Sequence, residues 1–256
     1  MGNDWKKVFE NPGKEYRSAP FWAWNEKINE QELKFQIQEM SDKGMGGFFI
    51  HSREGLETPY LSEDWMKQVD VAVREAKEKD MEVWIYDEDK WPSGCAGGLV
   101  SHTNPREYSA KGLTMELMSS EEIEKAVKKG RAFDTGKEYE DGKILRIYTV
   151  WISGYKILKL KNGICEESLK DSGSQILILR REISETSEWY NGYAPTDNLN
   201  PKAVQEFLKL THESYKKHFK DEFGKTIKGF FTDEPNCCDF YSVFTKGRPW
   251  ITWNDD

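Results

Sequence analysis

The sequence has no run of apolar residues that approaches the length of about 20 needed for a membrane-spanning helix. Its opening residues, MGNDWKKVFENPG, also lack the apolar core that a signal peptide requires. From these two absences we expect a cytoplasmic protein that has no membrane as a partner.

Cysteine is scarce and shows no metal-binding spacing. The four cysteines are Cys95, Cys165, Cys237 and Cys238, and none lies in a C-x-x-C motif or a Cys/His ligand pattern. The adjacent Cys237 and Cys238 are poor candidates for a disulfide, because a bridge between neighbouring residues is strained. We expect free thiols in a reducing compartment, and the sequence assigns no metal site and requires no cofactor.

Positive charge is in the minority: 37 basic residues stand against 45 acidic ones, for a formal net charge of −8. A surface of this sign repels phosphate backbones, so we exclude nucleic acid and anionic membranes as partners. Hydrophobic residues make up 37% of the chain and charged residues 32%, which is typical of a folded soluble protein rather than a disordered one.

Aromatic residues, in contrast, are abundant. Ten Trp, eleven Tyr and 13 Phe make up 13% of the chain. All of these rings could pack in the protein interior. Rings exposed near strand ends would instead be able to stack on the flat C–H faces of sugars. Composition alone leaves both explanations open.

The first part of the chain alternates between buried strands and amphipathic helices. Apolar segments at 18–25, 46–53 and 82–89 are predicted strands. Asn29 is the predicted cap of the helix after the first strand, with Glu32 completing a capping box and Gly44 ending the helix. Ser62 is the predicted cap of a second helix. Strands that are apolar on both faces and alternate with helices indicate a parallel sheet covered by helices.

This alternation stops between residues 107 and 188. The runs GLTMELM, KILRIYTVWI, YKILKLK and QILILRRE are predicted strands, Asn162-Gly163 is a hairpin turn, and SSEEIEKAVKKG is one short helix. We interpret the segment as a β-rich insertion after the third strand. Alternation resumes with a helix opened by Asn200-Pro201, which leads into a strand at 226–235.

Polar residues gather where these parallel strands end. Functional groups in parallel β/α folds lie at the carboxyl ends of the strands. A structural protein has no need to end each buried strand in ionisable groups, whose removal from water is costly. The pattern therefore predicts an enzyme, with candidate residues Trp24, Asn25, His51, Ser52, Arg53, Asp87, Glu88, Asp89, Asp233 and Glu234.

Each candidate also has a structural explanation. Glu234 could form a salt bridge and Asp233 could cap the following turn. Alternation places Asp87 and Asp89 on one side of their strand, where they could hold a substrate hydroxyl or a cation, or anchor the loop. His51 could support its neighbours by hydrogen bonding.

A carboxylic acid followed by proline suits a general acid. Pro235 fixes the backbone beyond Glu234, and partial burial would help the acid to retain its proton near neutral pH. Sugar hydrolysis usually requires two carboxyl groups that flank the glycosidic bond.

Five runs in order resemble the α-L-rhamnosidase-type glycoside hydrolases (glycoside hydrolase family 106): FWAWN, GGFFIHSREGLETPYLSEDW, VWIYDEDKWPSG, NPKAVQEFLKLTHESY and GFFTDEPN. The resemblance covers nearly the whole chain and is weakest in the 107–188 insertion. The related sugar-hydrolase superfamily carries its acid in an Asn-Glu-Pro run at the end of the fourth barrel strand. Here Asp233 replaces that Asn, while Glu234 and Pro235 are present.

The resemblance implies a TIM-type (β/α)8 barrel, an inverting attack on a terminal L-rhamnose, and a calcium ion that holds sugar hydroxyls. Members of the family are several times longer, and only four of eight strands are recognisable here. We therefore expect the first half of a barrel: strands one to three in 1–106, the β-rich insertion in 107–188, and a helix, the fourth strand and a truncated tail in 189–256. The second catalytic carboxylate has no assignable position.

From these residues we predict a glycoside hydrolase with Glu234 as general acid. We expect Asp233, Asp87, Asp89, His51, Trp24 and Asn25 to hold the sugar. Trp91 is a further candidate, either as a stacking platform or as a packed loop anchor. The alternatives are a non-catalytic carbohydrate-binding half-barrel and a hydrolase of another sugar. Half a barrel leaves two exposed strand edges, through which the chain would self-associate.

Overall fold

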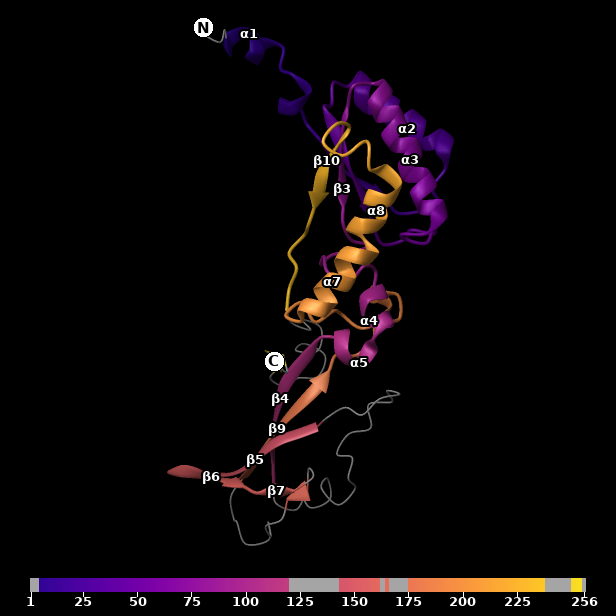
Figure 1. The fold of residues 1–256 in the computed structure, drawn as a ribbon. Coiled ribbons are helices and arrows are strands. Elements are labelled where there is room, and N and C mark those ends of the chain that lie inside the picture. The colour runs from indigo at the N-terminus through magenta and orange to yellow at the C-terminus, as the bar shows by residue number, and fades with distance from the viewer. Residues whose placement is uncertain (1–4, 120–142, 162–163, 166–174, 238–249, 255–256) are drawn as a thin grey trace. The chain divides into compact units, whose positions relative to one another are not determined.

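The computed structural model describes residues 5–119, 143–161, 164–165, 175–237 and 250–254 (Figure 1). The chain forms two compact units. Unit 1 comprises residues 1–100 and 204–236, and unit 2 comprises residues 101–203 and 237–256. Each unit contains its own sheet, one parallel and one antiparallel, so the α/β class predicted from the sequence is confirmed.

Unit 1 is built on a four-stranded parallel sheet. The order is β1 (Phe21–Trp24), β2 (Gly47–Ser52), β3 (Glu82–Tyr86) and β10 (Ile227–Phe231). The predicted strands are therefore present as parallel neighbours in chain order, although β3 ends before Asp87. The sheet does not close into a barrel within the described residues, and β1 and β10 form its two edges.

Helix ends in unit 1 follow from local capping. The Asn29 side chain accepts hydrogen bonds from the backbone N–H groups of Gln31 and Glu32 at the start of α2 (Glu30–Asp42). The carboxylate of Glu32 accepts a bond from Gln36 at 2.7 Å, so the predicted capping box does not form. Gly44 follows α2 with a positive φ of 77°, which glycine adopts without strain. Ser62 caps α3 (Glu63–Glu78) as predicted.

The helix predicted after Asn200-Pro201 is divided into α7 (Pro201–Leu210) and α8 (His212–Phe219). The division occurs at Thr211, whose hydroxyl donates to the carbonyl of Phe207 at 2.6 Å. A Thr that bonds back to the previous turn competes with regular helix geometry. The shorter helices are α1 (Trp5–Glu10), η1 (Lys14–Tyr16), α4 (Leu99–Thr103), α5 (Pro105–Tyr108) and η2 (Glu188–Tyr190).

Helices α2, α3 and α8 cover one face of the parallel sheet. Their apolar stripes meet strand residues that include Phe48, Ile50 and Ile85, all fully buried. Near the middle of this layer, the indole N–H of Trp65 donates to the hydroxyl of Tyr215 at 2.7 Å, which satisfies both buried polar groups. Removing such apolar surface from water is the main stabilising contribution to the unit.

The other face of this sheet carries aromatic rings. Strand register places Phe21, Phe49 and Trp84 side by side, and the rings of Phe49 and Trp84 stack 5.6 Å apart. Trp84 also lies over Gly229, where a Cβ atom would be in ordinary van der Waals contact with the ring at 3.4 Å. Phe21 is 52% exposed, and this aromatic face is therefore only partly covered. Its members are Phe21, Phe49, His51, Trp84, Tyr86 and Phe231.

Unit 2 contains a five-stranded antiparallel sheet. Its order is β11 (Trp250–Trp253), β4 (Lys111–Met118), β9 (Gln175–Ile183), β5 (Lys143–Trp151) and β6 (Gly154–Leu158). The strands predicted within 107–188 match β4, β5, β6 and β9, whereas β11 was not predicted. The indole of Trp250 covers Gly112, where any Cβ atom would lie 2.0 Å from the ring. Glycine is therefore required at that position.

Two sequence predictions fall outside the described residues. These are the short helix SSEEIEKAVKKG and the Asn162-Gly163 turn. The flanking strands β7 (Leu160–Lys161) and β8 (Ile164–Cys165) pair in the antiparallel direction. No helix within the described ranges is both long enough and apolar enough to cross a membrane.

Candidate functional site

The candidate residues lie where the strands of unit 1 end at their carboxyl termini. Asn25 follows β1, His51 and Ser52 end β2, the 87–89 run follows β3, and Asp233 and Glu234 follow β10. Because the strands are parallel neighbours, these residues share one edge of the sheet. The structure divides them into a buried network and an accessible group.

Asp87 is the centre of the buried network. It is fully buried, and its carboxylate accepts hydrogen bonds from Ser93 at 2.6 Å and from Thr232 at 2.5 Å. The imidazole Nε2 of His212 lies 3.4 Å from the same carboxylate and forms an ion pair when the ring is protonated. Both oxygens of Asp87 therefore bind protein groups, which favours the loop-anchoring role among the roles that the sequence left open for this residue.

Ser93 connects the loop after β3 to the end of β10. Its hydroxyl donates to Asp87 and accepts from the backbone N–H of Asp233 at 2.9 Å. In return, the backbone N–H of Ser93 donates to the carbonyl of Asp233, also at 2.9 Å. These reciprocal bonds fix the backbone immediately before Glu234.

Glu88 organises the glycine-rich loop. It is fully buried, and its carboxylate accepts five backbone N–H groups at 2.5 to 3.1 Å, from Asp89, Gly94, Cys95, Ala96 and Gly97. Burial raises the pKa of Glu88 to about 7, while the N–H donors act in the opposite direction. The loop can wrap around this group because several of its residues adopt positive φ angles.

Asp89 is also directed into the protein. It is 4% exposed and accepts hydrogen bonds from Ser52 and from the ammonium of Lys90, each at 2.6 Å. Like Asp87, it contacts the loop from a buried position, which favours the anchoring role that the sequence left open beside substrate binding. Trp24 is likewise 4% exposed and packs against Trp22 and Trp65 in the core.

The accessible group is formed by Asp233, Glu234 and Trp91. The indole N–H of Trp91 donates to the Oε2 atom of Glu234 at 3.0 Å. Asp233 is half-buried and accepts a bond from the hydroxyl of Tyr86 at 2.9 Å. Glu234 is exposed and has a positive φ of 42°, an uncommon conformation for a residue that carries a side chain. Such strained positions are typical of functional sites.

His51 adjoins this group through Tyr86. The two rings lie 3.9 Å apart, and Tyr86 binds Asp233. His51 is 9% exposed, and its Nε2 has no hydrogen-bond partner within the described part of the chain. Burial, reinforced by the charge of Arg53, lowers the pKa of His51 to about 4. The ring is therefore neutral near pH 7, and its unpaired Nε2 is shielded from solvent. Asn25 is exposed and directly follows β1, the strand that pairs with the His51-bearing strand β2.

Sequence reasoning missed the partners of the buried carboxylates. Ser93, Thr232 and His212 show no pattern in the sequence that would connect them to Asp87. The Trp91–Glu234 bond was also missed, although both residues had been identified. The contact of Trp91 with Glu234 is thus distinct from the stacking or anchoring predicted for this residue, which stays a prediction.

The calcium ion implied by the resemblance can be tested against these groups. No cluster of three or more His, Cys, Asp or Glu side chains that could hold a metal occurs among the described residues. The carboxylates of Asp87, Glu88 and Asp89 accept hydrogen bonds from protein donors. These residues do not fit a calcium ion, which would need other ligands.

Comparison with known proteins gives no family assignment. No protein family matches the chain, and no curated protein matches it. Among solved structures, a rhamnosidase from Novosphingobium sp. PP1Y aligns with a TM-score of 0.38 and 14% sequence identity. The alignment covers 62% of this chain and 17% of the rhamnosidase, so this chain spans a small part of that protein's length.

Proposed function

We propose that this chain carries the general acid of a glycoside hydrolase, and that Glu234 is that acid. The observation that supports the proposal is an exposed carboxylate at the carboxyl edge of a parallel sheet, held in a strained backbone conformation and oriented by Trp91. Sites of this kind position a proton donor against a bound substrate. The order of the sequence motifs gives the same assignment by resemblance.

The two carboxylate oxygens of Glu234 have different contacts. The indole N–H of Trp91 occupies Oε2, while Oε1 has no partner within the described residues and is available to the glycosidic oxygen. A proton on Oε1 would pass to the leaving oxygen as the bond to the anomeric carbon breaks. The Asp87–Ser93–Asp233 bonds keep the backbone of this segment in place during the reaction.

The sugar would lie against the accessible group. Asp233 and His51 offer hydrogen-bonding groups, and Asn25 adds an exposed amide. The aromatic face beside them provides rings for the C–H surface of a sugar. We propose a terminal α-L-rhamnose on the strength of the motif resemblance. The second carboxylate of an inverting hydrolase is not assigned to a residue of this chain.

A specific observation favours a second candidate, a non-catalytic carbohydrate-binding protein. Among the described residues, the Glu234 carboxylate makes one contact, with the indole N–H of Trp91, and an exposed carboxylate beside an aromatic ring is also what a sugar-binding site presents. In a binding protein, Glu234 would accept a bond from a sugar hydroxyl. This candidate predicts saturable sugar binding without hydrolysis.

The experiment compares Glu234→Gln with the unaltered protein on aryl α-L-rhamnosides of good and poor leaving groups. Glutamine keeps the shape and the acceptor for Trp91 but carries no transferable proton. Hydrolysis of substrates with poor leaving groups should fall by about 10²–10⁴-fold, the usual contribution of general acid catalysis. Substrates with an activated phenol need little protonation and should lose far less.

Asp233→Asn is the matched control, because it changes the adjacent carboxylate to an amide of the same shape. It should slow both kinds of substrate similarly. Equal losses from Glu234→Gln on both kinds would show that Glu234 is not the proton donor. Sugar binding with no turnover of any aryl glycoside would instead support the binding protein.

A further inference from the structure

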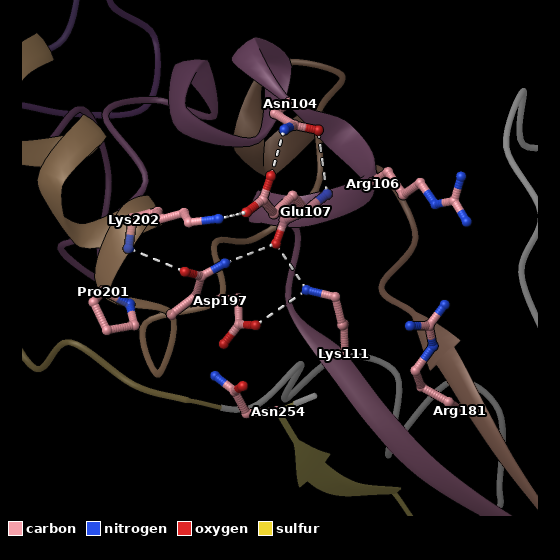
Figure 2. A pocket seen from close by; sticks show the side chains of 10 residues that line it. Asn104, Arg106, Glu107, Lys111, Arg181, Asp197, Pro201, Lys202 and Asn254 are labelled. Carbon is pink, nitrogen blue, oxygen red and sulfur yellow. Dashed lines mark hydrogen bonds and ion pairs between the residues drawn. The ribbon is translucent and has the colours of Figure 1, made fainter. Parts of the chain in front are cut away.

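Unit 2 contains a pocket of about 610 Å³ whose lining residues are all charged or amide-bearing apart from Pro201 (Figure 2). It is formed by α5, the start of β4, the end of β9, the start of α7 and Asn254. The charged side chains that line it are four cations and two carboxylates: Arg106, Lys111, Arg181, Lys202, Glu107 and Asp197. Positive charge is therefore in excess among the lining residues, although the whole chain has a net charge of −8.

The two carboxylates are already held by the two lysines. Lys202 donates to Glu107 at 2.7 Å, and Asn104 donates to the other oxygen of Glu107 at 3.0 Å. Lys111 is 6% exposed, and its ammonium donates to Asp197 at 3.1 Å and to the backbone carbonyl of Glu107 at 2.8 Å. These bonds make a rigid frame on one side of the pocket (Figure 2).

Two arginines add to this frame from different elements. Arg106 belongs to α5 and Arg181 to β9, and both line the same pocket. Figure 2 shows both guanidinium groups away from the lysine–carboxylate pairs, with that of Arg181 directed toward the side on which Arg106 lies. Arg106 is exposed and has no ion-pair partner within the described residues. Both guanidinium groups line the pocket and carry positive charge, so an anion held between them would be attracted by both.

We propose that this pocket binds an oxyanion, namely the carboxylate of an acidic sugar or a phosphate or sulfate group, between Arg106 and Arg181. Guanidinium groups present paired N–H donors that match the oxygens of such anions. The amides that line the pocket would donate further hydrogen bonds. This site belongs to unit 2 and does not depend on the proposed hydrolase activity.

The test is isothermal titration calorimetry of the whole chain with three anions at low ionic strength: inorganic phosphate, sulfate and galacturonate. Galactose serves as the neutral match for galacturonate. We expect saturable binding of at least one anion in the millimolar range, which weakens as salt rises, and no binding of galactose. The anion that binds most tightly identifies the source of the group.

Variants then place the binding in the pocket. Arg106→Gln and Arg181→Gln should each weaken anion binding by about fivefold to tenfold, because each removes a charge-assisted hydrogen bond. Glu107→Gln should strengthen binding, because it removes a negative charge and leaves Lys202 without its carboxylate. Arg74→Gln is the matched control: Arg74 is an exposed arginine on α3 that pairs with Asp70, and its loss should change nothing.

Circular dichroism of each variant checks that the fold is retained, and Arg106, being exposed, is the variant that decides the question if Arg181→Gln unfolds. Absence of binding by all three anions would overturn the proposal. Binding that is equally strong in Arg106→Gln, or that Arg74→Gln weakens to the same extent, would also overturn it, because the anion would then be bound elsewhere.

Discussion

Replacing Ser93 by alanine should weaken unit 1 more than the loss of a single hydroxyl group usually does. Ser93 is fully buried and its Oγ takes part in two hydrogen bonds, as donor to Asp87 and as acceptor from the N–H of Asp233. Loss of a bond to a charged group costs about 1.5–3 kcal/mol, and a half-buried N–H without an acceptor costs about 1 kcal/mol more. We expect Ser93→Ala to lower the free energy of unfolding by about 3 kcal/mol.

Urea unfolding followed by Trp fluorescence measures this loss. With a denaturant slope of about 2 kcal/mol per molar, the midpoint should fall by about 1.5 M. Ser101→Ala is the matched control, because the buried hydroxyl of Ser101 donates to the neutral backbone carbonyl of Ala194 at 2.6 Å. That variant should lose about 1 kcal/mol.

A second comparison identifies the charge as the cause. In Asp87→Asn the carboxylate is absent, so adding Ser93→Ala to that background should cost clearly less than it does in the unaltered chain. If Ser93→Ala costs no more than Ser101→Ala, or costs the same in both backgrounds, the proposed network does not hold the end of β10.

Three other predictions follow from the site and the sheet. Folding lowers the pKa of His51 from 6.5 to about 4, so the neutral ring contributes its full stability above pH 6.5 and loses it as pH falls toward 4, by up to about 3 kcal/mol. We expect the free energy of unfolding of the unaltered chain to fall over this pH range relative to that of His51→Phe. Parallel pH profiles for the two proteins would contradict this. Trp91→Phe keeps an aromatic ring but removes the N–H donor to Glu234. We expect at least a tenfold loss of kcat with little change in KM. An effect confined to KM would instead make Trp91 a stacking platform. Since β1 and β10 are edges of a parallel sheet, we propose that copies of the chain associate through them; sedimentation equilibrium should give a mass that rises with concentration, and a constant monomer mass would refute this.

Local chemistry explains which parts of the fold could be predicted from the sequence. Asn29, Gly44 and Ser62 mark helix ends through bonds to residues a few positions away, so the printed sequence already contains both partners. The apolar runs of β2 and β3 are continuous because both faces of these strands are largely buried. These features depend on short stretches of chain, and the structure agrees with them.

The buried roles of Asp87 and Asp89 could not be predicted in the same way. Alternation placed both on one side of a strand, but β3 ends at Tyr86, and the backbone beyond it no longer alternates. Thr232, which donates to Asp87, is distant in sequence and becomes a neighbour only when β10 pairs with β3. A carboxylate at a strand end appears the same in sequence whether it faces a substrate or a serine.

The antiparallel sheet of unit 2 has a consequence for the time course of folding. Strand β4 pairs with β11, so residue 111 acquires its neighbour only when residue 253 has left the ribosome. Within unit 1, residue 83 must likewise wait for residue 227, with the strands of the second unit synthesised in between. Both sheets therefore carry an unfilled edge through most of synthesis, and closing such long loops is slow. A nascent chain of this protein would spend that interval with strand edges open to pairing with wrong partners.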